Sequence, residues 1–218
     1  MPLPGIIVVD GDHVTVSRIG RIADAMHVPI ESFATAEELL GSSACDHNGV
    51  VVCEFRLLGC NGIDMQQRLR KLNPHIQIVF LTAFAETWLT VLAMQNGAYT
   101  VIDKPGGEQQ LWDAIRMAMD RYRTAITQQH ANDQLLDDIG QLNQRQRDVL
   151  EMMLEGLPNK LVAERLHISI RTVESCRHAV FEQTGTGSLA ELVRRVTLAR
   201  LHAPDPLIDQ NLDIKNRM

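Results

Sequence analysis

The first half of the chain alternates short hydrophobic runs with segments of helical periodicity. Continuous runs of this kind are typical of buried strands, and they occupy residues 5–9, 30–33, 50–53, 76–81 and 99–102. Helix-like segments separate them, at about residues 14–26, 36–40, 63–72 and 86–95, with a longer one from 108 onward. Strands and helices that alternate in this way predict a doubly wound, flavodoxin-like α/β domain with a five-stranded parallel sheet.

The second half of the chain has helical patterns only. A segment from about 109 to 134 lacks glycine and proline, and it predicts one long helix whose polar second half connects two domains. Breaks at 156–158, 167–169 and 185–187 divide the next segment into four short helices. The chain is therefore predicted to contain a first domain, a helical linker, a small all-α domain and a loosely ordered tail, at residues 1–123, 124–140, 141–203 and 204–218.

Composition and charge narrow the class of protein. The 218 residues are 45% hydrophobic and 22% charged, as in ordinary globular domains. No run approaches the ~20 apolar residues that cross a bilayer, and no basic segment opens the chain, so we expect a cytoplasmic protein without a membrane partner. The net charge is −6, yet residues 141–203 contain nine Lys or Arg against seven Asp or Glu. Only this segment is positive, which keeps nucleic acid among the possible partners.

Polar residues follow the predicted strands. Asp10, Glu54 and Thr82 each come directly after a hydrophobic run, Lys104 lies just past the last run, and Asp12 lies two residues beyond Asp10. The carboxyl ends of parallel strands meet at one edge of a sheet, so these side chains should form one site. Carboxylates for a metal ion, a hydroxyl group and an ammonium group for a phosphoryl oxygen are the groups that phosphoryl transfer uses. Asp12 also has the position of a helix N-cap.

The motifs around these residues resemble the receiver domain of two-component response regulators over residues 5–123. They are Val8-Val9-Asp10, Leu57-x-Gly59-x-Asn61-Gly62, Leu81-Thr82-Ala83, Asn96-Gly97-Ala98 and Asp103-Lys104-Pro105. The resemblance implies that an aspartate after the third strand accepts a phosphoryl group, that nearby acids hold Mg²⁺, and that Thr82 and Lys104 respond. In this chain the acceptor position is Glu54, the second acid is replaced by Gly11, and the aromatic switch residue is Val101.

These departures indicate an atypical receiver. Glutamate extends the carboxylate by about 1.5 Å and carries negative charge where a phosphoryl group would lie, so our first hypothesis is that Glu54 partly imitates the phosphorylated state. In the alternative, Glu54 only pairs with Lys104 and the receiver is a phosphate-blind dimerisation module. Phosphorylation of Glu54 itself is chemically conceivable but less favoured. A metal would use Asp10, Asp12 and Glu54, but Gly11 weakens that set, so we expect no required cofactor.

Another class of function is a sensor whose receiver cleft binds a ligand or responds to oxidation. The cysteines, Cys45, Cys53, Cys60 and Cys176, form no C-x-x-C pair, which disfavours a disulfide framework or a zinc site. Cys53 and Cys60 flank the Glu54 loop, although strand alternation directs Cys53 away from Glu54. The sequence offers no nucleophile and base pair, so we do not expect an enzyme.

The C-terminal domain contains a predicted helix-turn-helix. Two helices meet at Leu166-His167-Ile168, and Ser169 is the predicted N-cap of the second helix. Val173, Cys176 and Val180 share one face of that helix and should be core. The opposite face carries Arg171, Glu174, Ser175 and His178. This face is either a reader of the DNA major groove or the solvated surface of a protein-interaction module.

Residues 142–193 are similar to the LuxR-type DNA-binding domain, and Gly-Leu-Pro-Asn-Lys with Arg-Thr-Val-Glu resembles its FixJ-type branch. The resemblance implies that Glu174, Ser175 and His178 face base edges and that the phosphate contacts are Lys160, Arg171, Thr172 and Arg177. Cys176 and Gln146 depart from the family's histidine and glutamate, as packing or capping adjustments. We therefore expect a DNA-binding transcriptional regulator of the FixJ/NarL response-regulator family.

The resemblance also implies partners. They are double-stranded DNA, a second copy of the chain and RNA polymerase, while a cognate histidine kinase is left open. The family's dimer surface would include Trp88, Leu89, Leu92, Leu111, Trp112 and Ile115, most of which we expect to be core. A second contact would use Leu189, Leu192, Val193 and Val196.

Overall fold

A computed structural model describes residues 4–46, 48–57, 59–83, 85–104 and 106–202. The chain divides into two compact units, residues 1–126 and 127–218, and each is described by itself. The predicted tail at 204–218 lies outside the described residues, as does Pro105 of the last receiver motif. Among the described helices, none combines the length and hydrophobicity needed to cross a membrane.

The first unit is built on a five-stranded parallel sheet in the order β2-β1-β3-β4-β5. The strands are β1 (Gly5–Val9), β2 (Ile30–Phe33), β3 (Asn48–Cys53), β4 (Gln77–Thr82) and β5 (Thr100–Asp103). Val9 pairs with Cys53, and Thr82 with Asp103. This register places the residues that follow β1, β3 and β5 at one edge, next to the end of β4. The predicted fold class is confirmed.

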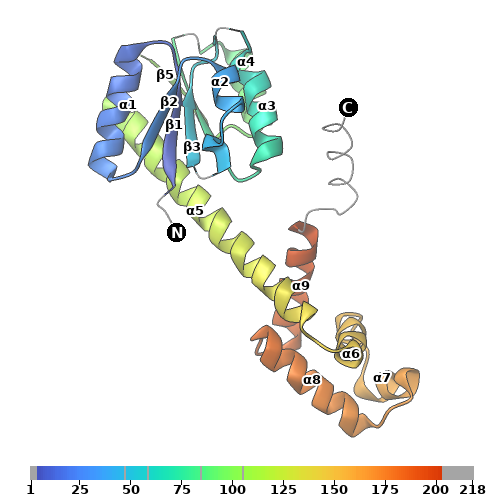
Figure 1. Cartoon of the computed structure of the whole chain (residues 1–218). Helices are drawn as coiled ribbons and strands as arrows, with labels where there is room; N and C mark the ends of the chain where they lie inside the picture. Colours follow the sequence, from blue (N-terminus) through green and yellow to red (C-terminus); the bar gives the residue numbers. More distant parts are fainter. Residues whose placement is uncertain (1–3, 47, 58, 84, 105, 203–218) are drawn as a thin grey trace, which may run out of the picture. The chain divides into compact units, whose positions relative to one another are not determined.

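Helices cover both faces of this sheet (Figure 1). One face carries α1 (His13–Met26) and α5 (Glu108–Gly140), and the other carries α2 (Ala36–Leu40), α3 (Gly62–Leu72) and α4 (Thr87–Gln95). Successive strand residues enter different cores: Val8 packs on the α1 side and Val9 on the other. Because both faces are buried, the strands appear in the sequence as continuous hydrophobic runs. The short 3-10 helix at Ala44–Asp46 was not predicted.

Two local features shape the edge where the strands end. Asp12 is the N-cap of α1, as predicted, and its Oδ1 accepts a hydrogen bond from the Val14 N–H at 3.0 Å. Gly62 begins α3 directly beside the backbone that follows β3: a Cβ at Gly62 would lie 2.8 Å from the Glu54 carbonyl oxygen. Glycine therefore permits α3 to pack closely against this edge.

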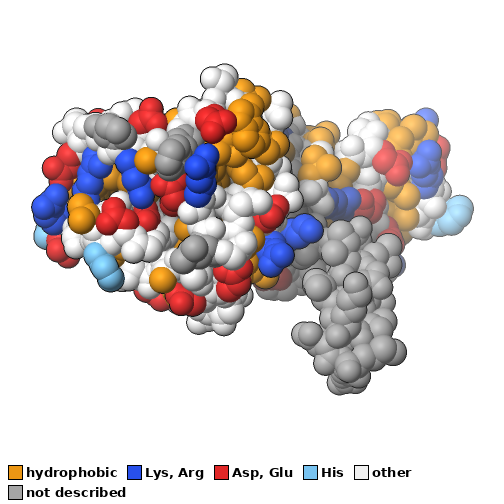
Figure 2. All heavy atoms as spheres, turned by 90° about the horizontal axis from the view of Figure 1, so that it is seen from above, with side chains coloured by type: hydrophobic (Ala, Val, Ile, Leu, Met, Phe, Trp, Pro, Cys, Tyr) orange, Lys and Arg blue, Asp and Glu red, His pale blue; other side chains and the backbone are white. Residues whose placement is uncertain are grey.

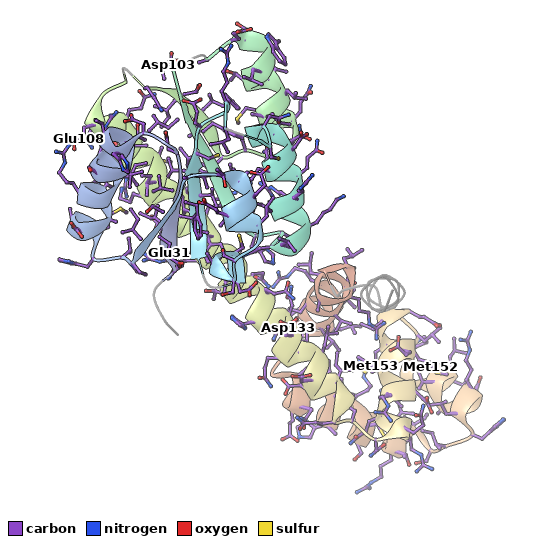
Figure 3. All side chains as sticks on the ribbon, turned by 45° about the horizontal axis from the view of Figure 1, so that its top comes forward. Glu31, Asp103, Glu108, Asp133, Met152 and Met153 are labelled. Atoms are coloured by element: carbon purple, nitrogen blue, oxygen red, sulfur yellow. The ribbon has the colours of Figure 1, made fainter. Side chains whose placement is uncertain are left out.

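The second unit contains the four predicted short helices and the end of α5. They are α6 (Gln144–Leu154), α7 (Asn159–Leu166), α8 (Ile170–Thr184) and α9 (Leu189–His202). Their core includes Leu150 and the buried Met153 of α6, labelled in Figure 3. Leu135 of α5 is 1% exposed and belongs to the same core. The last turns of α5 are thus part of this unit, in addition to connecting it to the first.

The polar part of α5 is held by side-chain hydrogen bonds along the helix. Gln128 donates to Asn132, Gln129 to Asp133 and Gln134 to Asp138, at 2.9, 2.7 and 3.0 Å. Each such pair at i and i+4 stabilises a helix by about 0.2–0.5 kcal/mol. Asp133 is labelled on this segment in Figure 3. The amide pairs explain how a stretch with few hydrophobic residues remains helical.

Candidate functional site

The predicted polar residues at the sheet edge come together in a charged pocket. Asp10 follows β1, Glu54 follows β3, Thr82 ends β4 and Lys104 follows β5. The Lys104 Nζ lies 2.9 Å from Asp10 Oδ2 and 3.2 Å from Glu54 Oε2. Asp10 and Glu54 are only 7% and 8% exposed. One ammonium group therefore bridges two buried carboxylates, and we call these three residues the Lys104 pocket.

The remaining carboxylate oxygens in the Lys104 pocket also have donors. Glu54 Oε1 accepts from the Phe55 N–H at 2.7 Å, and Asp10 Oδ1 accepts from the Asp12 N–H at 2.9 Å. The Lys104 N–H donates to the Thr82 carbonyl at 2.7 Å, which extends the sheet hydrogen bonding by one residue. The carboxylate charges are thus balanced and hydrogen-bonded within the chain, as buried charges require.

The charge of Lys104 is strongly favoured in this environment. Burial lowers the pKa of a lysine, but here hydrogen bonds and charge attraction from Asp10 and Glu54 outweigh that effect. The net result is a pKa of Lys104 above its ordinary value. Lys104 is therefore a permanent cation at neutral pH.

Asp12 and Gly11 determine what metal ligands the pocket offers. Both oxygens of Asp12 bind the start of α1, because Oδ2 accepts from the Thr15 hydroxyl at 2.8 Å, and these hydrogen bonds lower the pKa of Asp12. Gly11 supplies no ligand. In the part of the chain that the structure describes, no group of three or more His, Cys, Asp or Glu side chains is arranged for a metal ion. Of the three candidate acids, only Asp10 and Glu54 keep their carboxylates at the pocket, and this pair does not fit the octahedral oxygen set of Mg²⁺.

The thiols near Glu54 have little thiolate character. Burial raises the pKa of Cys53 well above its ordinary value, and the charge of Glu54 adds to the effect. Partial burial also raises the pKa of Cys60, whose Sγ donates to the Asn61 carbonyl at 3.4 Å. Since the thiolate is the reactive form, the raised pKa values disfavour oxidation of these cysteines.

The second site is the outward face of α8, the candidate nucleic-acid interface. Ser169 caps the helix as predicted, with its Oγ accepting from the Thr172 N–H at 3.1 Å. Val173, Cys176 and Val180 are buried. The predicted contact residues on the other face are exposed at Arg171, Glu174, Ser175 and His178, and half-buried at Thr172 and Arg177. Thr172 also shares its hydroxyl with Ser169 Oγ at 2.8 Å.

Cations near this face differ in how they are paired. Within the described residues, Lys160, Arg171 and Arg177 have no carboxylate within ion-pair distance, whereas Arg165 of α7 pairs with Glu155 at 3.4 Å. Cations that have no carboxylate partner are free to bind the phosphates of DNA, and a helix of this size fits the major groove.

One cation beside this face was not predicted from the sequence. A hollow of about 550 Å³ lies between the start of α6 and α8, and it places Arg145 near Thr172 and Ser175. Arg145 is exposed and, among the described residues, has no carboxylate partner. Its position in the first turn of α6 was the available signal, but its distance along the chain from α8 concealed the contact. The same helix start explains Gln146, which completes a capping box with Asn143.

Comparisons with known proteins match both units of the chain. The response regulator receiver domain family matches residues 6–116, and the bacterial regulatory proteins of the luxR family match residues 140–196. Nodulation protein W of Bradyrhizobium diazoefficiens is 32% identical over 190 residues, which cover 87% of this chain and 84% of that protein. FixJ of Azorhizobium caulinodans is 29% identical over 198 residues, or 91% and 94% of the two chains.

A solved structure gives the same result. The response regulator StyR has a TM-score of 0.73 and 31% identity, covering 89% of this chain and 98% of that one. This chain therefore belongs to the response regulator family and combines a receiver domain with a LuxR-type helix-turn-helix domain. Within that family it is a DNA-binding transcriptional regulator of the FixJ type, and not an enzyme.

Proposed function

We propose that this response regulator controls transcription without transfer of a phosphoryl group to residue 54. The observation that carries the proposal is the Lys104 pocket, in which Lys104 Nζ lies 3.2 Å from Glu54 Oε2. Where the family has an acceptor aspartate, this chain has a glutamate whose two oxygens bind Lys104 and the Phe55 N–H. A phosphoryl group would have to displace these partners.

The strength of the Glu54 charge limits how far it can shift the receiver toward its active state. Two unit charges about 4 Å apart attract by about 4 kcal/mol at an effective dielectric constant near 20, before desolvation is subtracted. Moving a two-state equilibrium from 1:99 to 99:1 requires about 5.5 kcal/mol. Glu54 thus acts as a partial imitation of the phosphorylated state. If its charge has no effect on DNA binding, the receiver is instead a phosphate-blind dimerisation module.

The proposal includes function without Mg²⁺. It is supported by the use of both Asp12 oxygens at α1 and by Gly11 at the position of the family's second acid. Asp10 and Glu54 serve as the counter-charges of Lys104.

DNA recognition is assigned to the outward face of α8. A helix of 15 residues is about 22 Å long and fits the major groove. Glu174, Ser175 and His178 would face base edges, and the phosphate contacts would be Lys160, Arg171, Thr172 and Arg177. Glutamate suits an acceptor for cytosine N4. Two copies would bind paired half-sites in the cytoplasm and contact RNA polymerase.

Of the residues suggested for the first dimer surface, most were expected to be core, but fewer are buried than expected. Leu111 and Ile115 are fully buried in their own domain, while Trp88 and Leu92 of α4 are 63% and 37% exposed and remain available. Leu192 and Val196 are also fully buried, in the core of the second unit. They cannot form a contact between copies, because α9 uses them to pack within its own chain.

One observation favours a second candidate function, a ligand-responsive regulator. A hollow of about 460 Å³ between α3 and α4 is lined in part by Phe55, Ile63, Trp88 and Leu92. Its size lies in the range of small-molecule sites. Phe55 also donates its N–H to Glu54, so a ligand there would touch a neighbour of the Lys104 pocket. Figure 2 shows hydrophobic side chains gathered in a patch among mixed charges on this domain.

The test is DNA binding without any phosphodonor. DNA selected from a random pool is titrated with the parent chain and with Glu54→Gln, and sedimentation measures the stoichiometry. Tight dimeric binding by the parent supports the proposal. Weaker binding by Glu54→Gln then identifies the partial imitation, and equal binding identifies the dimerisation module. Binding that appears only after a phosphodonor or a small molecule is added would contradict it.

A further inference from the structure

Arg18 of α1 holds the loop that carries Lys104. Its Nη2 donates to the Gly106 carbonyl at 2.8 Å, and its Nη1 donates to the Lys104 carbonyl at 3.3 Å. Figure 3 marks the two ends of this loop with Asp103 of β5 and Glu108 of α5. We propose that Arg18 is a positioning residue that keeps the Lys104 ammonium between Asp10 and Glu54. This inference deepens the proposed function, because it names what maintains the Lys104 pocket.

The sheet anchors the start of this loop. The Lys104 N–H bonds to the Thr82 carbonyl, and the Gly106 N–H bonds to the Asp103 carbonyl, both at 2.7 Å. A Cβ at Gly106 would lie 2.7 Å from the Asp103 carbonyl oxygen, so the turn is tight and requires glycine. Arg18 binds two of the loop's carbonyl oxygens from a different element, α1.

Arginine has the chemistry that this contact needs. Its guanidinium group is a planar fork with several fixed donors, so one side chain can bind two carbonyl oxygens of a turn. Lysine offers a single ammonium on a flexible stem and cannot reproduce that geometry. Arg18 is half-buried, which shields its hydrogen bonds from water. The side chain thereby fixes the position of the backbone from which Lys104 extends.

Lys104 depends on that backbone position. Its long stem has many rotamers, and attraction to a carboxylate falls as the separation grows. Lys104 faces two carboxylates at 2.9 and 3.2 Å, so a shift of the loop weakens both contacts at once. If Arg18 merely attached α1 to the start of α5, its loss would lower stability without affecting the ammonium. The reactivity of the Lys104 amine separates these two roles.

The experiment measures acylation of lysine amines by mass spectrometry across a pH series, with exposed Lys71 as the internal reference. Arg18→Met keeps the apolar stem and removes the donors. We expect Lys104 in Arg18→Met to react at least about threefold faster than in the parent, within the range for weakening a partly exposed ion pair. The direction follows because only the neutral amine reacts, and loosened ion pairs lower the pKa of Lys104. Arg18→Lys should give an intermediate rate.

Arg21→Met is the matched control. Arg21 lies on the same helix and pairs with Glu108 at 3.5 Å. It should leave the Lys104 rate unchanged. An unchanged Lys104 rate in a folded Arg18→Met chain would overturn the proposal, and thermal unfolding verifies the fold. If Arg18→Met does not fold, the test uses Arg18→Lys. A Lys104 rate in Arg18→Lys equal to that of the parent would contradict the proposal, because lysine lacks the forked donors of arginine.

The two proposals fail separately in this design. The amine rate alone decides whether Arg18 positions Lys104. DNA affinity of the parent without a phosphodonor decides the proposed function. A faster Lys104 rate in Arg18→Met together with phosphodonor-dependent DNA binding would retain the positioning role and reject phosphorylation independence.

Discussion

The two functional regions differ in how their charged side chains are paired. In the Lys104 pocket, buried carboxylates of Asp10 and Glu54 share one ammonium whose side chain is 23% exposed. On the outward face of α8 and beside it, Arg171, Arg177 and Lys160 have no carboxylate within ion-pair distance among the described residues. The pocket is electrostatically satisfied by its own chain, and the α8 face is not. A site that satisfies itself suits a fixed state, and a site with unpaired cations suits an external anion.

The largest expected effect tests whether the two regions are independent units. Leu150 and Leu69 are each fully buried, one in the second unit and one in the first. Replacing either by alanine should lower stability by about 2–5 kcal/mol. Calorimetry should show Leu150→Ala destabilising only the helix-turn-helix transition, and Leu69→Ala only the receiver transition. A single transition that shifts equally in both variants would contradict two separate units.

The next prediction concerns a double substitution that should make the Lys104 pocket bind a metal ion. A Cβ at Gly11 meets nothing within 4 Å, so Gly11→Asp has room for its side chain. Combined with Glu54→Asp, it should restore an acidic set for Mg²⁺. At Mg²⁺ a hundredfold above Kd, binding should stabilise the double variant by about 2.7 kcal/mol. Thermal unfolding with and without Mg²⁺ measures this stabilisation, and the parent chain is the control. An equal stabilisation of the parent by Mg²⁺ would contradict our interpretation of the pocket.

Loss of the bridging ammonium should have an effect of similar or smaller size. Lys104→Met leaves two buried carboxylates without their cation and should cost about 1–3 kcal/mol. In the parent, the raised pKa means that the Lys104 contribution is complete at neutral pH and is lost as the pH rises through that pKa. Denaturation from neutral to alkaline pH should therefore show a decline that Lys104→Met lacks. Parallel declines in the two chains would contradict this assignment.

The smallest effect concerns the unpaired cations. Arg171→Ala should reduce the salt dependence of DNA binding by about one phosphate contact, a slope change near 0.9 in log K against log salt. Arg165→Ala removes an arginine that pairs with Glu155 and should leave the slope unchanged. Affinity measured over a series of salt concentrations distinguishes them. Equal slopes for Arg171→Ala and the parent would remove Arg171 from the phosphate contacts.

Local patterns predicted much of the fold. Hydrophobic runs gave every strand of the first unit to within a few residues, and the caps Asp12 and Ser169 were identified because their hydrogen bonds reach only two or three residues along the chain. The place of Leu135 in the second core was not predicted, because it follows a polar stretch. Periodicity identified the apolar face of α9, but it could not tell whether Leu192 packs within its own chain or against a second copy.

The candidate sites were predictable to the extent that topology fixes them. Residues that follow parallel strands must meet at one edge, so the membership of the Lys104 pocket followed from the strand pattern. The sequence did not predict that Arg18 binds the loop after β5 or that Arg145 lies near α8. Both contacts join residues that are far apart in the sequence. Side-chain contacts of this kind depend on tertiary packing, which the hydrophobic periodicity of the sequence does not report.

The most direct test of the central claim is one sample treated with a small-molecule phosphodonor and Mg²⁺. Intact mass reports whether residue 54 is phosphorylated, and DNA affinity is measured before and after treatment. We predict an unchanged mass and an unchanged affinity. A stoichiometric phosphoryl adduct that maps to Glu54 and strengthens DNA binding would contradict the claim.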